Sequence, residues 1–370
     1  MLDTPPSPLL SICISTYNAA HLLRVTLGAV LPQVLAAAGR VEVLVVDDGS
    51  QDDTPSVIEA ARSYGPVSYV RNEKNLGSSA NLVTGPTRHA NGEFVWSWNQ
   101  HCLLYPGALD RLLEVLDAQR DLNVLYVNFR CANYPRDWPE QAVGGYAGAM
   151  DYLGNQDLES RAVPSWQELV DPKTGVCTQS YAHLIKRSVW TTYWATREVG
   201  ESYRNALTTY PHTYMLAESV FRQPSYYVGS PLLTIFNGAQ SWGDLKGRAK
   251  VYLLGYPDLI RTFKRQGWQR DKQIKAERWG AEQAGAIMLQ AFREKRGDVT
   301  AMLPRYLLRY GTDRGVVRAV WNAFLDSRCC WLARMLVTAG ERMARWWEYC
   351  FHNCRPARWI RSMLGSNGGA

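Results

Sequence analysis

The 370-residue sequence contains no run of about 18 uninterrupted apolar residues, which is the length that an ordinary membrane-spanning helix requires. Its opening, MLDTPPSPLLSICIST, also lacks the basic segment, the long apolar stretch and the small-residue cleavage site of a secretory signal. We therefore expect a cytoplasmic protein. Any contact with a membrane would then be peripheral, on the inner face of the plasma membrane.

A disulfide framework is also missing, because 8 cysteines in a chain of this length without an export signal are better explained as reduced thiols. Near the C-terminus, the adjacent pair of cysteines and the CFHNC segment do not match the paired-ligand spacing of zinc sites. With 46% hydrophobic and 20% charged residues, the composition is that of a globular protein and excludes extensive disorder.

The net charge of +7 is unevenly distributed along the chain. Residues 245–370 hold 24 Lys and Arg against 10 Asp and Glu, or +14, whereas residues 1–244 hold 17 against 24, or −7. A basic C-terminal third suits an anionic membrane surface, a polyphosphate-bearing lipid or a nucleic acid. Nucleic acid is disfavoured because no recognised nucleic-acid-binding motif accompanies the basic residues.

Apolar runs with the properties of strands alternate with helical segments over about the first 120 residues. Strands are predicted near 9–15, 41–46, 67–72 and 93–98, and helices follow them. This alternation predicts an α/β fold with a largely parallel sheet. Because ligands bind at the carboxyl ends of such strands, the polar loops 15–18, 47–50 and 98–102 are expected to converge.

The remaining chain alternates less regularly, with strands predicted in YVNFR, TQSYAHLIK and YYVGSPLLTIF. These segments are interpreted as the acceptor-facing part of the same domain. Helical patterns dominate from about Asp244 onward. The sequence therefore predicts a domain over 1–244 and a basic, Trp-rich helical region over 245–370.

Four segments in order, SICISTYN at 11–18, VEVLVVDDGSQDDT at 41–54, RNEKNLGSSANL at 71–82 and GEFVW…LLYPGAL at 92–109, resemble family 2 glycosyltransferases. A weaker similarity to their abequosyltransferase-like branch extends to about residue 242. The resemblance implies a Rossmann-like GT-A fold, a nucleotide-diphospho-sugar donor, and transfer with inversion to a glycan or polyprenyl-linked acceptor in bacterial surface polysaccharide assembly.

The strand-end residues fit nucleotide binding on chemical grounds. The carboxylates of Asp47 and Asp48 can accept hydrogen bonds from a base N–H or from ribose hydroxyls. Thr16, Tyr17 and Asn18 would line the same pocket. The alternative is that TYN and DDGS are simply turn and cap residues.

The segment around Asn75, Gly77 and Asn81 resembles the part of the family that lies beneath the sugar diphosphate. Glycine permits close backbone approach there. Capping of the next helix explains either asparagine equally well.

The sequence departs from the family at the metal site. Members usually carry an Asp-x-Asp motif after the fourth strand, since a divalent cation bridging two phosphates prefers carboxylate oxygens. Here the motif is degenerate and the corresponding residues are Asn99, Gln100, His101 and Cys102. Asn99, Gln100 and His101 would still lie beside the diphosphate, whether or not Mn²⁺ or Mg²⁺ takes part.

Three hypotheses follow from this departure. In the first, the enzyme works without a metal and stabilises the leaving diphosphate with cationic side chains and amide donors. In the second, His101, alone or with Cys102 and His212, binds a softer ion such as Mn²⁺ or Zn²⁺. In the third, catalysis is lost and binding or scaffolding remains.

An inverting transfer needs a general base, and the family places it near the start of a helix after the middle strands. In this sequence that position is Tyr210-Pro211-His212, so His212 is the predicted base. A structural histidine is the alternative. His183 in its predicted strand is expected to be buried and hydrogen-bonded, Glu218 to be a surface or packing residue, and Asp244 to cap a helix.

The segment 328–350 has apolar residues at helical spacing and arginines elsewhere. Tryptophans interleaved with arginines suit a helix lying at a membrane interface. Packing on the catalytic domain and a homo-oligomer interface are the other interpretations.

The sequence thus predicts an inverting glycosyltransferase. The alternative is a catalytically lapsed GT-A protein that binds a nucleotide-sugar or glycan and acts through a partner. Nucleotidyl transfer is disfavoured because TYNAAHLLR lacks a glycine-rich, basic phosphate loop.

Overall fold

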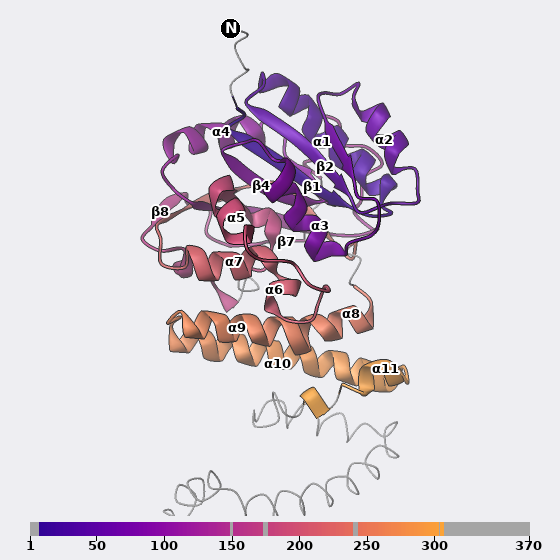
Figure 1. Cartoon of the computed structure of the whole chain (residues 1–370), viewed down its shortest axis with the longest axis vertical. Helices are drawn as coiled ribbons and strands as arrows, with labels where there is room; N and C mark the ends of the chain where they lie inside the picture. The colour runs from indigo at the N-terminus through magenta and orange to yellow at the C-terminus, as the bar shows by residue number, and fades with distance from the viewer. Residues whose placement is uncertain (1–6, 149–150, 173–176, 240–242, 303, 307–370) are drawn as a thin grey trace, which may run out of the picture. The chain divides into compact units, whose positions relative to one another are not determined.

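The structure is a computed structural model that describes residues 7–148, 151–172, 177–239, 243–302 and 304–306 (Figure 1). Within these residues the strands are β1 (Leu10–Thr16), β2 (Val41–Asp47), β3 (Ser68–Arg71), β4 (Phe94–Asn99), β5 (Cys102–Leu104), β6 (Val124–Asn133), β7 (Tyr152–Leu153), β8 (Arg161–Val163), β9 (His183–Lys186) and β10 (Ser225–Asn237).

The helices are α1 (Ala20–Ala36), α2 (Thr54–Ala61), α3 (Ser78–Thr84), α4 (Ala108–Ala118), α5 (Arg187–Trp194), α6 (Ala206–Thr209), α7 (Pro211–Ser219), α8 (Leu245–Lys250), α9 (Tyr256–Arg265), α10 (Arg270–Arg293) and α11 (Gly297–Thr300). Shorter helical turns are η1 (Gly85–His89), η2 (Trp166–Glu168), η4 (Ser180–Ala182) and η5 (Val251–Gly255). The strands and helices predicted in the first 120 residues are confirmed to within a few residues at their ends.

One sheet runs through the described chain in the order β3-β2-β1-β4-β9-β6-β10-β5, with β7 beside β6 and β8 beside β10. The pairs β2–β3, β1–β2, β1–β4 and β6–β10 are parallel. Strand β9 is antiparallel to both of its neighbours, β4 and β6. Strands β5 and β8 are antiparallel to β10, and β7 is antiparallel to β6. The prediction of a largely parallel sheet therefore needs correction, because only the part formed by β3, β2, β1 and β4 is parallel throughout.

Two helical groups cover the sheet, and further helices form an outer layer (Figure 1). Helices α1, α2 and α4 pack together on one face, and α3, η1, α5, α6 and α7 pack on the other. Helix α9 lies against α6 and α7, and α10 lies against α9.

Strands β1, β2 and β4 have apolar residues on both faces because helices cover both sides of the sheet. Their sequences, LSICIST, VEVLVVD and FVWSWN, are buried at nearly every position. The edge strand β3 is partly exposed instead. Burial on both faces leaves the strand ends as the places where polar side chains of these strands can meet a ligand.

The outer helices share the core of the sheet domain. Leu259, Ile260 and Phe263 of α9 and Trp268 are buried in the same apolar cluster as the strands. The described residues up to Tyr306 form one compact unit. The boundary between 244 and 245 stays a prediction.

Several sequence predictions lie outside the described residues, namely those on segment 328–350 and on the C-terminal cysteines. Among the described residues, no helix combines the length and the apolar character needed to cross a bilayer. Four cysteines in this part of the chain, Cys13, Cys102, Cys131 and Cys177, are buried free thiols, as predicted.

Candidate functional site

The loops after β1, β2 and β4 lie together at one edge of the sheet, as predicted. Parallel pairing aligns Thr16 with Asp47 and Ser15 with Asn99. Beyond the strands, the N–H of Asp48 donates to the Thr16 carbonyl oxygen at 2.9 Å. The carboxyl ends of three neighbouring strands therefore form one surface.

Asp47 ends β2 and is fully buried. Its Oδ1 accepts from the backbone N–H of Ser50 at 2.9 Å and from the Ser50 hydroxyl at 2.5 Å. Its Oδ2 accepts from the Tyr69 hydroxyl at 2.6 Å and lies 3.6 Å from the Nε of Arg71. These contacts fix the turn after β2, so turn stabilisation is one role of this carboxylate.

Asp48 holds the loop between β3 and α3. Its Oδ1 accepts from the Asn72 side chain at 3.0 Å and from the Leu76 N–H at 2.8 Å, and its Oδ2 accepts from the Gly77 N–H at 3.0 Å. Each carboxylate oxygen has two acceptor positions, so the Oδ2 of Asp48 retains one. Asp48 is only 2% exposed, so this remaining acceptor position lies below the surface.

The segment after β3 is shaped by these bonds rather than by helix capping. Gly77 precedes α3 with φ of 90°, a conformation that favours glycine, and it offers no side chain to cap this helix, whose Ser79 N–H donates to the Ser202 hydroxyl at 3.3 Å instead. Asn75 accepts from the Gly77 N–H at 2.9 Å. Asn81 is buried and donates to the Val46 carbonyl oxygen at 2.9 Å. The alternative that either asparagine caps the helix is therefore wrong.

The residues after β1 differ in exposure. Tyr17 is 42% exposed, whereas Thr16 is buried and its hydroxyl has no hydrogen-bond partner among the described residues. Asn18 has a φ of 47°, and its side chain accepts from the Gln51 N–H at 2.7 Å. Asn18 thus ties the β1 loop to the β2 loop and leaves the Tyr17 ring free to meet a ligand.

Arg71, at the end of β3, is a charged residue of this surface that the sequence reasoning did not single out. Its Nη2 donates to the Ser50 carbonyl oxygen at 2.5 Å, and its side chain is 46% exposed. The S-Y-V-R alternation of β3, which sends Tyr69 and Arg71 to one side, was the available signal.

The turn from Asn99 to Cys102 connects β4 to β5. Asn99 and Gln100 are half-buried and His101 is buried. Burial lowers the pKa of His101 to about 4 and raises the pKa of Cys102 to about 12. Both side chains are therefore neutral at pH 7.

The residues of this turn do not fit a hard divalent cation, because they include no carboxylate and Cys102 is a protonated thiol. No group of three or more His, Cys, Asp or Glu side chains in the described ranges is arranged to hold a metal ion. His101, Cys102 and His212 thus do not form such a group, and a metal-binding role for His101 stays a prediction.

His212 begins α7 and lies in the interior, 4% exposed. Its Nε2 is 2.9 Å from the Thr213 hydroxyl, and its ring centroid is 5.9 Å from that of His183. Burial, and then the nearby His183, lower the pKa of His212 well below its ordinary value. The ring has no direct access to an acceptor, so its catalytic role stays a prediction.

Three smaller predictions are confirmed. His183 is 1% exposed, and its Nδ1 lies 2.9 Å from the Gln179 carbonyl oxygen. Glu218 accepts from the Tyr193 hydroxyl at 2.7 Å. Asp244 is the N-cap of α8 and accepts from the Gly247 N–H at 2.7 Å.

Sequence reasoning missed a second polar group at this edge, which we call the β6–β10 cluster: Asn133, Arg136, Asp137, Asp151 and Asn237. Asn133 and Asn237 end β6 and β10 and are paired in register. The Nη2 of Arg136 donates to Asp137 at 2.7 Å and to Asp151 at 2.6 Å. The Asn133 side chain also donates to Asp151.

The β6–β10 cluster adjoins the turn after β4. The N–H of Phe236, one residue before Asn237, donates to the His101 carbonyl oxygen at 3.2 Å. Ile235 pairs with Cys102 on one side and with Cys131 on the other. One strand spacing, about 5 Å, therefore separates Cys102 from β10, and two, roughly 10 Å, separate it from Cys131 of β6.

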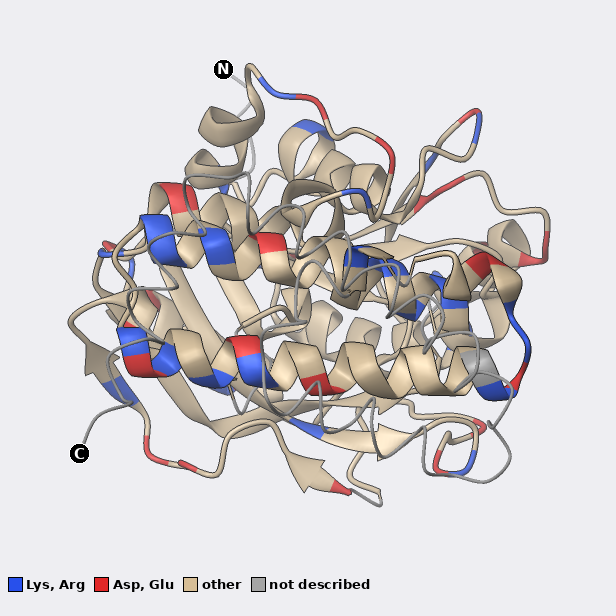
Figure 2. Ribbon diagram, turned by 90° about the horizontal axis from the view of Figure 1, so that it is seen from below, with Lys and Arg blue, Asp and Glu red and all other residues tan. Residues whose placement is uncertain are grey.

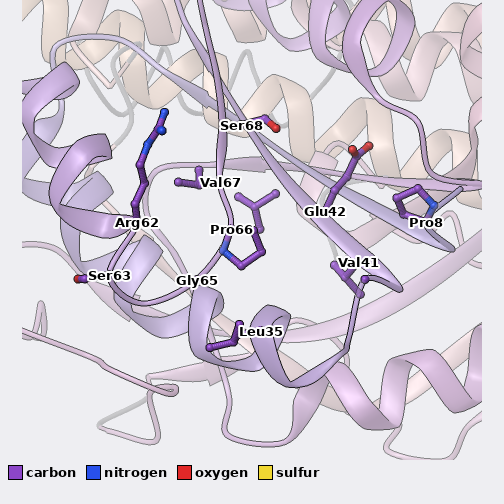
Figure 3. Close-up of a pocket in the computed structure, with 12 residues that line it drawn as sticks. Pro8, Leu35, Val41, Glu42, Arg62, Ser63, Gly65, Pro66, Val67 and Ser68 are labelled. Carbon is purple, nitrogen blue, oxygen red and sulfur yellow. The ribbon is translucent and has the colours of Figure 1, made fainter. Parts of the chain in front are cut away.

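Two hollows lie in different parts of the described surface. The larger, of about 630 Å³, lies at the amino ends of β2 and β3, where Val41 and Ser68 line it (Figure 3). It is at the opposite end of these strands from the loops described above. The other, of about 570 Å³, is bordered by His21, Arg24 and Trp138, and His21 lies 3.2 Å from the Tyr134 hydroxyl.

Comparison with known proteins finds similarity to one family over part of the chain. Residues 11–163 match the model of glycosyl transferase family 2. An uncharacterised glycosyltransferase of Rickettsia typhi is 32% identical over 120 residues, which are 32% of this chain and 35% of that protein. An uncharacterised glycosyltransferase of Mycoplasma pneumoniae is 30% identical over 140 residues, which are 35% of this chain and 46% of that protein. The chain thus spans about a third to a half of the length of these relatives.

Similar solved structures include TarS 1–349 of Staphylococcus aureus in complex with UDP, at a TM-score of 0.44, 14% identity and coverage of 77% of this chain and 72% of that one. Another is the mannosyltransferase PcManGT of Pyrobaculum calidifontis in complex with GDP-Man and Mn²⁺. Its TM-score is 0.46 and its sequence identity 17%, and the match covers 87% of this chain and 89% of that one. Given the family match and the sheet order described above, the fold is the predicted α/β GT-A fold with a helical C-terminal region.

Proposed function

We propose that the protein is a glycosyltransferase that moves a sugar, with inversion, from a nucleoside-diphosphate donor to a hydroxyl of a glycan or lipid-linked acceptor. The observation that carries this proposal is the match of residues 11–163 to the family 2 model, since these residues include the loops after β1, β2, β3 and β4. The abequosyltransferase-like branch and a role in surface polysaccharide assembly are finer proposals, which rest on the weaker similarity up to residue 242.

The donor nucleotide would bind over the ends of β1, β2 and β3. The exposed ring of Tyr17 is suited to stacking on a base. The unpartnered Thr16 hydroxyl and the remaining acceptor position of Asp48 can meet polar groups of the nucleotide. Asn18 and Asp47 would act by holding the two loops in place.

The diphosphate would lie between the loop at Asn75 and Gly77 and the turn at Asn99, Gln100 and His101. A metal-independent site is favoured because carboxylates without a cation would repel phosphates, and this turn contains none. Arg71, with its side chain 46% exposed, supplies positive charge at the same edge. If Mn²⁺ or Mg²⁺ takes part instead, turnover of the donor would depend on adding the metal ion.

A peripheral contact with the inner face of the plasma membrane is part of the proposal, because it would bring the enzyme to a polyprenyl-linked acceptor. Lys and Arg recur along the two long helices seen from below, interrupted by Asp and Glu (Figure 2). On α9 and α10 the exposed ones include Arg261, Lys264, Arg265, Arg270 and Arg278. Such a surface is attracted to anionic lipid.

The test is turnover of a panel of UDP-, GDP-, CDP- and dTDP-sugars by the full chain, measured as release of the nucleoside diphosphate. We expect one donor class to be consumed, faster when a polyprenyl-linked sugar is present. His212→Asn in the same assay tests the predicted base. Consumption of no donor by a protein that binds a nucleotide would remove the catalytic proposal.

The second candidate is a binding protein that has lost catalysis and acts through a partner. Two observations favour it, namely the absence of carboxylates between Asn99 and Cys102 and the interior position of His212. It predicts nucleotide-sugar binding without turnover, so the same panel separates the two candidates.

A further inference from the structure

The carboxylates at the carboxyl edge differ in their freedom to act on a substrate. Asp47 and Asp48 are buried, and they accept from the turn after β2 and from the β3–α3 loop, respectively. Asp137 is 11% exposed, and hydrogen bonds from Arg136 and from the Asn133 N–H hold its pKa at about 2. Asp151 belongs to the same β6–β10 cluster and keeps 32% of its side chain exposed. Among these four, Asp151 is the carboxylate best able to meet an acceptor.

Asp151 is held in place at the end of β6. Its N–H donates to the Cys131 carbonyl oxygen at 2.7 Å, which fixes its backbone against the strand. Arg136 donates to its Oδ1 at 2.6 Å, and Asn133 donates to Oδ2. A base fixed in this way needs little reorganisation when the acceptor arrives.

The position of Asp151 suits a displacement at the donor sugar. Burial raises the pKa of Cys131 to about 11, and the charge of Asp151 adds to this effect, so the carboxylate is near that thiol. Cys131 lies two strands from Cys102, roughly 10 Å away. The leaving diphosphate beside the β4–β5 turn and a base beside the end of β6 would then flank the sugar from opposite sides.

Other polar groups near Asp151 are poor bases. Burial raises the pKa of Tyr152 to about 12, and its hydroxyl accepts from the Asn237 side chain at 3.0 Å. Burial also raises the pKa of Tyr181 well above its ordinary value. Both hydroxyls are protonated at pH 7, which leaves the proton-accepting role to the carboxylate.

We propose that Asp151, rather than His212, is the general base of the transfer, a proposal that rests on the function proposed above. The acceptor oxygen bonds to the anomeric carbon as its proton passes to a carboxylate oxygen of Asp151. The bond from that carbon to the β-phosphate oxygen breaks, and its electron pair leaves with the nucleoside diphosphate. The Asp151 carboxyl then returns the proton to water.

The experiment uses Asp151→Asn in the full chain and the donor that the wild type consumes. We expect kcat to fall about 100-fold or more, the usual contribution of a general base, while KM and the nucleotide Kd change less than twofold. The acidic limb of the pH profile of kcat is expected to disappear with the carboxylate.

The matched control is Asp157→Asn, which removes another exposed carboxylate that is paired with an arginine, Arg161, near the amino end of β10. This variant is expected to keep wild-type turnover. The proposal is overturned if Asp151→Asn keeps more than a third of wild-type kcat, or if Asp157→Asn loses as much. It is also overturned if His212→Asn abolishes turnover and Asp151→Asn does not.

Two further outcomes separate this proposal from the function on which it rests. A wild type that binds a nucleotide and splits no donor refutes the transfer and, with it, the role of Asp151. Normal turnover by Asp151→Asn refutes the role of Asp151 alone. Should Asp151→Asn lose its native circular dichroism, Asp151→Glu keeps the charge but moves it; at least a tenfold loss of kcat supports the proposal, and full turnover overturns it.

Discussion

Lowering the pH from 7.5 to 5.0 should destabilise the protein through its buried histidines. Burial lowers the pKa of His101 and of His183 to about 4 each. In the unfolded chain an imidazole has its ordinary pKa, about 6.5, and takes up a proton that the folded chain refuses. Stability is therefore fully present above about pH 6.5 and is lost as the pH falls towards about 4.

The magnitude follows from the two protonation equilibria. At pH 5 an unfolded imidazole is almost fully protonated, whereas one with a folded pKa of about 4 carries roughly a tenth of a proton. The difference corresponds to about 2 kcal/mol for each histidine, or about 4 kcal/mol for His101 and His183 together. The pKa of His212 is lowered in the same direction, so its effect adds to theirs.

The assay is urea unfolding at pH 7.5 and at pH 5.0, followed by tryptophan fluorescence. His183→Gln removes one titrating group, so the loss of unfolding free energy between the two pH values should shrink by about 2 kcal/mol. Thr87→Ala, which changes a half-buried residue of η1 that does not titrate, is the control and should leave that loss unchanged. If His183→Gln and the wild type lose the same unfolding free energy between pH 7.5 and 5.0, the buried His183 is not a source of the acid destabilisation.

Three further predictions concern the loops and the sheet. Asp48→Ala should lower the unfolding free energy by about 1–3 kcal/mol, because it removes three hydrogen bonds and leaves the Leu76 N–H without an acceptor, while Gly77 and Asn72 keep Asn75 and Asn81 as acceptors. Urea unfolding measures this, and an unchanged unfolding free energy would argue against the loop contacts. Gly92→Ala should lower the unfolding free energy by about 1–3 kcal/mol, since the added Cβ would lie 2.5 Å from the Ser11 backbone nitrogen. Gly297→Ala is the control: a Cβ there has open space, so its urea unfolding should match the wild type. Tyr17→Ala should weaken nucleotide binding about tenfold or more through lost stacking, and Tyr64→Ala, which is 41% exposed elsewhere, should not; equal affinities in a calorimetric titration would contradict the donor site.

The local elements of the first 120 residues were predictable because their signals are local. The run VEVLVV followed by DDGS predicts a buried strand and a turn, and β2 and the Asp47–Ser50 turn are observed. The insertion of β9 between β4 and β6 was not predictable in this way. The sequence HLIK shows a strand, but its two antiparallel partners lie about 90 and 60 residues earlier in the chain.

The candidate site was predictable in its chemistry and not in its contacts. A carboxylate at Asp48 is visible in the sequence, but its hydrogen bonds to Leu76 and Gly77 depend on how the β3–α3 loop folds back. His212 stands at a helix start as predicted, and its burial results from packing against His183. Asp151 follows no recognisable motif, and its position depends on its pairing with the end of β6.

The loops at the carboxyl ends of β1, β2 and β3 are proposed to bind a nucleoside diphosphate without a metal ion. The decisive experiment is a calorimetric titration of UDP, GDP, CDP and dTDP into the full chain, each with EDTA and again with Mn²⁺. We predict that one of the four binds with the same Kd under both conditions. Binding that requires Mn²⁺ would contradict the metal independence, and the absence of binding by all four under either condition would contradict the donor site itself.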